Sequence, residues 1–234
     1  MLKIPNRIGL PESEYSGIDS LRECHDRKHF LNYSKKISYR YNSRGFRDHE
    51  WPQDLSEVIW CVGDSFTVGL GQPFEETWPQ LLEKKLGRRC LNVGEDGCSN
   101  DTLSMRIQEI SRLYKPKHII VMWSYLSRRR VNNVNVHHDK KSFGFKEDVT
   151  NFVKNYAIVN QLPNIVNLIV PNATTRPDTL NKFLKKLLNK EKNNYPKLLN
   201  FQVIDLARDG LHFDVNTSTN ITKLICENME CVDK

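Results

Sequence analysis

The segment VIWCVGDSFTVG, residues 58–69, decides the fold class. Its first six residues form a continuous apolar run that ends in glycine, which is typical of a strand buried on both faces of a parallel sheet. Gly63 and Gly69 allow a tight turn after this strand. Ser65 then begins a helical segment, where backbone N–H groups can stabilise negative charge. The segment predicts an α/β domain with a candidate nucleophilic hydroxyl after its first strand.

The same alternation of apolar runs and helical patterns continues along the chain. Further strands are expected at residues 90–94, 118–123, 165–170 and 201–206. Helices are expected at residues 73–86, 100–114, 147–162, 178–189 and 216–229, with Asn100 or Asp101 capping the second. This order implies right-handed βαβ units. We therefore expect a three-layer α/β/α sandwich around a five-stranded parallel sheet with a flavodoxin-like strand order.

The 234 residues fit one large domain. Residues 1–55 are polar and irregular, and we expect an extended arm or small hairpin that packs on the main domain, residues 56–234. Residues 128–145 are rich in basic residues, Asn and His, and are expected to form a loop.

The chain carries 35 Lys and Arg against 28 Asp and Glu, a net charge of +7. The excess is spread along the chain, which favours a solvated basic surface over a specific nucleic-acid partner. No run is apolar and long enough for a signal peptide or a membrane span, so we expect a cytoplasmic protein without a membrane partner. The sequence predicts no oligomeric state.

The six cysteines show no short C-x-x-C spacing, which favours free thiols in a reducing compartment. His25 and His29 have the i, i+4 spacing of a helical zinc-ligand pair, with Cys24 nearby. No Glu lies between them in the catalytic pattern, and ordinary surface residues are the favoured interpretation. We expect no metal.

Asp209 and His212 follow the last expected strand and are three residues apart, so one turn can place both side chains on one side. The carboxylate can accept the imidazole Nδ1 proton, which leaves Nε2 free to take a proton from a serine. In a flavodoxin-like sheet the loops after the first and fifth strands meet at one edge.

Three segments resemble signature blocks of the SGNH (GDSL-type) hydrolases. Residues 63–69, GDSFTVG, resemble the first block, residues 92–99, NVGEDGCS, the second, and residues 209–212, DGLH, the last. Residues 42–48, NSRGFRD, are similar to an N-terminal segment of some members. The resemblance covers residues 40–225.

The resemblance implies a serine ester hydrolase with Ser65 as the nucleophile, His212 as the base and Asp209 as the residue that orients it. It implies an oxyanion hole formed by the N–H groups of Ser65 and Gly97, with Gly94 as the second choice for the glycine. It also implies small acyl esters as substrates, O-acetyl groups on carbohydrates among them, and no cofactor.

The third block departs from the family pattern, which has Gly-x-Asn-Asp after the third strand. Here residues 122–128 read MWSYLSR, without the asparagine that donates to the oxyanion. Ser124 can supply a hydroxyl instead, and Arg128 or Arg129 a compensating charge; Asp64, Arg128 and Arg129 are also candidate substrate-binding residues. Loss of one oxyanion donor costs about 10²- to 10³-fold in turnover. The alternative is therefore a catalytically weak or inactive binding protein for glycan or another macromolecule on the same fold.

Overall fold

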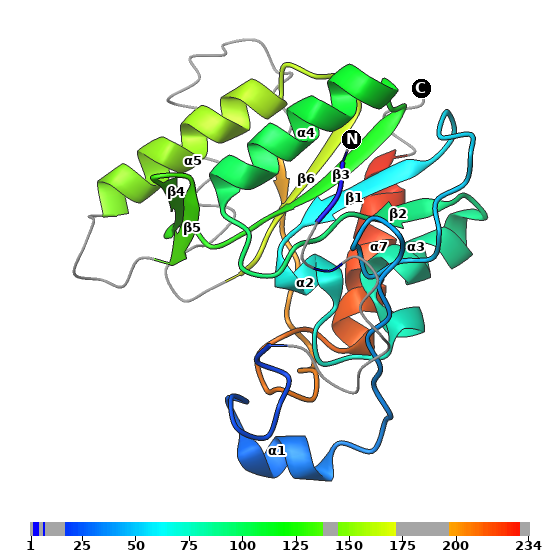
Figure 1. Ribbon diagram of the computed structural model, residues 1–234, viewed down its shortest axis with the longest axis vertical. Coiled ribbons are helices and arrows are strands. Elements are labelled where there is room, and N and C mark those ends of the chain that lie inside the picture. The colour runs from blue at the N-terminus through cyan, green and yellow to red at the C-terminus, as the bar shows by residue number, and fades with distance from the viewer. Residues whose placement is uncertain (1, 5–6, 8–16, 138–144, 172–196, 230–234) are drawn as a thin grey trace.

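The computed structural model describes residues 2–4, 7, 17–137, 145–171 and 197–229. The helix expected at residues 178–189 lies outside these residues. Figure 1 shows a central sheet with helices on both faces, as the sequence predicts.

The sheet has five parallel strands in the order β2-β1-β3-β6-β7, the expected flavodoxin-like order. Their bounds are β1 Ile59–Gly63, β2 Cys90–Asn92, β3 His118–Trp123, β6 Ile165–Ile169 and β7 Leu198–Leu199. Every residue of β1, β3 and β6 is buried. Helices cover both faces of the sheet, so these strands have no solvent-facing side, and their sequences are apolar except for the buried His118 and Asn167.

Two hydrophobic clusters lie on opposite faces of this sheet. The helices α4, Asn100–Tyr114, and α5, Phe145–Val159, contribute to the cluster that contains Val62 and Val121. The helices α3, Trp78–Leu86, and α7, Val215–Met229, cover the other face, where Cys61 and Ile120 lie. Successive residues of a strand therefore point into the two hydrophobic clusters in turn.

Three helical expectations shift in detail. The helix expected at residues 73–86 is divided into a short 3-10 helix, η2 Phe74–Glu76, and α3, which begins at Trp78. Ser99, rather than Asn100 or Asp101, caps α4, because its hydroxyl accepts a hydrogen bond from the Thr102 N–H. The helix expected at 147–162 runs two residues earlier at its start and ends at Val159.

Two expectations were wrong. Residues 201–206 form no strand: the N–H groups of Ile204 and Asp205 donate to Thr217 Oγ1 at the start of α7 and not to a neighbouring strand. Residues 128–137 form an antiparallel hairpin, β4 Arg128–Val131 and β5 Val134–His137. Its two-residue turn, Asn132-Asn133, has φ of 48° and 64°, the left-handed conformation that asparagine tolerates best among residues with side chains.

The described part of the N-terminal arm packs against the sheet domain. Leu2, Ile4 and Phe46 belong to the main core, and the Ile4 N–H donates to the Arg44 carbonyl at 2.8 Å. Arg47 is buried and donates to the carbonyl oxygens of Ser38, Val68, Gly69 and Gln72. One buried side chain thus ties the arm to the turn that follows Ser65. The arm also forms one short helix, α1 Arg27–Asn32.

Within the described ranges, no helix has both the length and the apolar character that crossing a membrane requires. The same part of the chain contains no cluster of three His, Cys, Asp or Glu side chains suited to a metal ion. Its five cysteines are free thiols. Burial raises the pKa of Cys98 to about 12, so this thiol stays protonated and behaves as a small apolar side chain.

Candidate active site

Ser65 is the first residue of α2, Ser65–Val68, the four-residue helix that follows β1. The Asp64 carboxylate caps this helix by accepting the Phe66 N–H at 3.1 Å. Gly69 ends it with φ of 75°. Gly63 is required before it, because a Cβ there would lie 2.0 Å from Thr67 Oγ1. These local constraints place the serine at the carboxyl end of β1.

His212 lies on a loop, residues 205–214, that folds back on itself. An antiparallel bridge joins Leu206 to Phe213, and the Ala207 N–H donates to the His212 carbonyl at 2.8 Å. The Asp209 side chain accepts the N–H groups of Leu211 and His212 at 2.9 and 3.0 Å, which makes the turn at the tip. This turn brings Asp209 and His212 side by side.

The two segments meet with the imidazole between the hydroxyl and the carboxylate. His212 Nε2 lies 2.8 Å from Ser65 Oγ, and His212 Nδ1 lies 2.5 Å from Asp209 Oδ2. All three residues are at most 2% exposed. Burial by itself would raise the pKa of Asp209, but the hydrogen bond and the charge of His212 hold it below its ordinary value. The carboxylate therefore stays ionised and fixes the imidazole with Nε2 toward the serine.

The arm holds this loop from outside. Arg208 donates to both oxygens of the buried Asp19, from Nε at 2.9 Å and from Nη2 at 2.8 Å. The His25 N–H donates to the Asp209 carbonyl at 2.8 Å, and His29 Nε2 lies 2.9 Å from the Ala207 carbonyl. The two histidines considered as zinc ligands thus contact the loop that carries His212.

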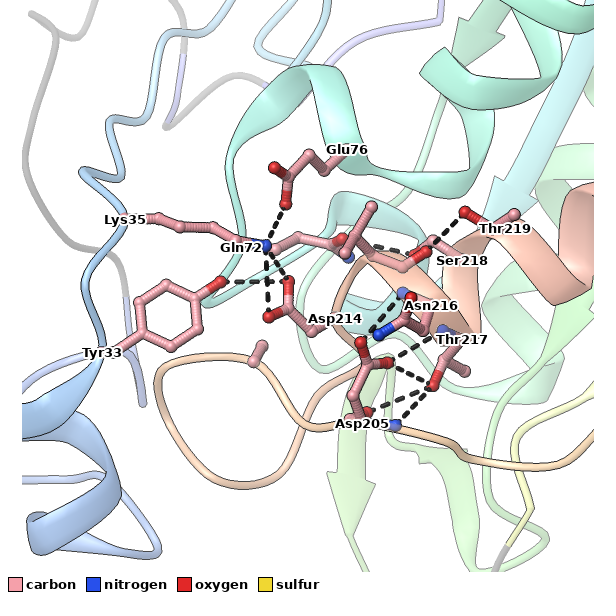
Figure 2. Close-up of polar contacts among 12 residues, drawn as sticks. Tyr33, Lys35, Gln72, Glu76, Asp205, Asp214, Asn216, Thr217, Ser218 and Thr219 are labelled. Atoms are coloured by element: carbon pink, nitrogen blue, oxygen red, sulfur yellow. Dashed lines mark hydrogen bonds and ion pairs between the residues drawn. The ribbon is translucent and has the colours of Figure 1, made fainter.

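A second set of contacts fixes the base of the loop (Figure 2). Lys35 lies between Glu76 and Asp214, at 2.5 and 3.1 Å, and the Tyr33 hydroxyl donates to Asp214 at 3.0 Å. Asp205 accepts the N–H groups of Asn216 and Thr217 at the start of α7. Both ends of the loop are therefore anchored by side chains that the sequence analysis did not single out.

Comparison with solved structures agrees with this architecture. The esterase EstA from Pseudoalteromonas sp., inhibited by monoethylphosphonate, superposes with a TM-score of 0.50 at 17% identity, over 75% of this chain and 98% of that one. The lipase/acylhydrolase from Enterococcus faecalis superposes with a TM-score of 0.50 at 15% identity, over 75% of this chain and 96% of that one. No protein-family model matches the chain, and no curated protein matches it by sequence. This chain has the SGNH hydrolase fold.

The second signature block of the SGNH fold offers two glycines here. Gly94 is buried, its N–H donates to Asn92 Oδ1 at 3.0 Å, and a Cβ there would lie 2.6 Å from the Val68 nitrogen. Its role is to let this loop approach α2 closely. Gly97 is exposed, has φ of 70°, and has open space where a Cβ would stand. Of the two, Gly97 stays the candidate for an oxyanion donor.

The third block departs from the SGNH pattern in structure as well as in sequence. The Ser124 hydroxyl donates to Asp64 Oδ2, and its oxyanion role stays a prediction. Arg128 Nη1 donates to the same oxygen at 2.8 Å. Asp64 is completely buried and accepts from Phe66, Ser124 and Arg128, so its substrate-binding role stays a prediction without support from these contacts.

Arg129 is likewise held within the protein. It forms an ion pair with Asp148 at 2.6 Å, and both side chains are less than 15% exposed. The anion-binding role of Arg129 stays a prediction, and in this structure its charge is paired with Asp148.

Asn100 fixes the backbone at the end of β3, a role the sequence did not suggest. Its Oδ1 accepts the Ser124 N–H at 2.9 Å, and its Nδ2 donates to the Tyr125 carbonyl at 3.1 Å. The side chain is thus committed to the backbone of the third block.

Proposed function

We propose that this chain is a serine ester hydrolase of the SGNH type. The observation that carries the proposal is the position of His212, within hydrogen-bonding distance of Ser65 Oγ on one side and Asp209 on the other. This arrangement satisfies the geometric demand on a nucleophile, its base and the group that orients the base.

In this mechanism Ser65 Oγ attacks the acyl carbonyl while His212 Nε2 takes the hydroxyl proton. The N–H groups of Ser65 and Gly97 stabilise the oxyanion of the tetrahedral intermediate. Its collapse breaks the ester C–O bond, and His212 returns the proton to the departing alcohol. Water, deprotonated by the same imidazole, then releases the acid from the acyl-enzyme. Asp209 stabilises the imidazolium in both steps, and no metal or cofactor takes part in the steps proposed.

Small acyl esters are the proposed substrate class, with O-acetyl groups on carbohydrates as one candidate. The similar solved structures named as an esterase and a lipase/acylhydrolase support ester chemistry at this site. The acyl and alcohol groups depend on loop residues and are left to a panel of esters.

The test uses a fluorophosphonate probe and p-nitrophenyl acetate. The parent should be labelled stoichiometrically at Ser65, and Ser65→Ala should lose both labelling and turnover. Ser127→Ala is the matched control, a half-buried serine in the turn after β3. Ester turnover by Ser65→Ala at the rate of the parent would overturn the proposal.

A non-catalytic binding protein on the same fold is the second candidate. The departure in the third block favours it. The asparagine that donates to the oxyanion in the SGNH pattern is missing, and the hydroxyl of Ser124 donates to Asp64 instead. Parent protein that binds acetylated glycan but resists the fluorophosphonate would select this alternative.

A further inference from the structure

Arg128 lies close to the candidate nucleophile, although 63 positions separate it from Ser65 in the sequence. Gly63 pairs with Met122 in the last register of β1 and β3, so the segments that carry Ser65 and Ser124 leave the sheet next to each other. Arg128 is the first residue of β4 and reaches back to this point. Its Nη1 lies 2.8 Å from Asp64 Oδ2 and 3.3 Å from Ser124 Oγ.

The charge of Asp64 makes this contact significant. Asp64 directly precedes Ser65, is completely buried, and uses its other oxygen to cap α2. An unpaired carboxylate in that place would repel the oxyanion that forms on the acyl group bonded to Ser65 Oγ, and burial would strengthen the repulsion. Arg128 places a cation against this carboxylate, which offsets its negative charge beside the serine.

The guanidinium also retains donors for a ligand. A guanidinium has five N–H groups, and within the described ranges the polar contacts of the Arg128 side chain all run through Nη1. The side chain is 14% exposed, lying 5.4 Å from the centre of the Tyr125 ring. That ring packs edge-on against Phe66, the residue after Ser65. The head of Arg128 is therefore fixed beside α2 with N–H groups to spare.

Side-chain length explains how an arginine can act there. Serine is shorter than asparagine, and in this chain Ser124 directs its hydroxyl to Asp64. The guanidinium of Arg128 contacts that same hydroxyl. The guanidinium thus lies beside the position where the SGNH pattern has an asparagine side chain.

We propose that Arg128 is a catalytic residue of the ester hydrolysis proposed above, donating to the oxyanion where the SGNH pattern has an asparagine. The inference rests on that proposed function. In this role Arg128 stabilises the charged tetrahedral intermediate and does not bind the neutral ester more tightly. Loss of Arg128 should therefore lower kcat and leave KM nearly unchanged.

The experiment measures kcat and KM for p-nitrophenyl acetate in Arg128→Met, Arg128→Lys and the control Arg130→Met. Arg130 lies on the same strand, and its guanidinium contacts the exposed Met105 instead of Asp64. Arg128→Met should lose about 10²- to 10³-fold in kcat, as removal of an oxyanion donor does. The kcat of Arg128→Lys should lie between those of the parent and Arg128→Met, because lysine keeps the charge and loses the fork of N–H groups. Arg130→Met should equal the parent.

Chemical rescue separates catalysis from folding. Arg128→Ala should regain kcat when guanidinium chloride is added at concentrations below those that unfold it, whereas Ser65→Ala should not. Arg128→Lys and this rescue decide the matter even where Arg128→Met folds poorly.

Several results would overturn the inference while leaving the esterase proposal intact. These are a kcat for Arg128→Met close to that of the parent, a loss confined to KM, or a loss that follows stability without rescue by guanidinium. Unchanged turnover in Ser65→Ala would instead overturn both proposals.

Discussion

Asp19→Asn tests whether the arm positions the candidate base. Asp19 is completely buried, receives two hydrogen bonds from Arg208, and also accepts the Tyr39 hydroxyl at 2.5 Å. The substitution keeps the size of the side chain and removes its charge, which leaves the Arg208 guanidinium without its buried carboxylate.

The expected cost follows from the burial of the pair. Breaking a buried ion pair by removing one partner costs about 3–5 kcal/mol. The Arg208 side chain keeps 15% exposure, and the asparagine oxygen can still accept hydrogen bonds, so we expect the low end, about 3 kcal/mol. Urea unfolding of the parent and the variant measures this change.

The consequence for the site is a slower reaction of Ser65. Arg208 directly precedes Asp209, so a loop released at Arg208 shifts the imidazole, and a displacement of 1 Å can cost about 10²-fold. We expect fluorophosphonate to label Ser65 in Asp19→Asn at least about tenfold more slowly. Lys223→Met is the control, since Lys223 lies 4.0 Å from Glu227 and is 77% exposed. It should change neither quantity.

Two outcomes would refute this reasoning. An unfolding free energy within about 0.5 kcal/mol of the parent would show that the buried pair contributes little, as exposed pairs do. A large loss of stability with unchanged labelling would show that the arm stabilises the fold without positioning His212.

Two further predictions concern the site itself. Asp209→Asn should lower kcat about 10⁴-fold through the wrong imidazole tautomer; and because the folded pKa of Asp209 is depressed, its contribution to stability is complete above the unfolded pKa and is lost as pH falls through the folded value, so acid titration of unfolding should show a smaller loss in the variant than in the parent. Gly94→Ala should cost about 1–3 kcal/mol in thermal unfolding and slow the labelling of Ser65, since its Cβ would lie 2.6 Å from the Val68 nitrogen of α2. Gly97→Ala, with open space and an intact N–H, should cost about 1–2 kcal/mol for its positive φ and retain labelling; equal effects of the two substitutions on labelling would contradict this assignment.

Much of the fold was predictable because its signals are local. The apolar runs at β1, β3 and β6 specify strands buried on both faces, and helical periodicity located α4 and α7 within one residue. The hairpin of β4 and β5 was missed because its turn signal, Asn132-Asn133 between two valines, is weak until the positive φ of both asparagines is seen.

The sequence by itself determined the placement of Ser65 after β1 and the turn that pairs Asp209 with His212. Each depends on residues within a few positions of one another, where steric and hydrogen-bonding rules leave few alternatives. Only the tertiary structure decided that Asp64 is shared by Ser124 and Arg128, that Asp19 holds Arg208 across 189 positions, and that Thr217 takes the N–H groups of residues 204 and 205 from the sheet. A buried polar group must find a partner, but which of many distant partners it meets depends on how the elements pack.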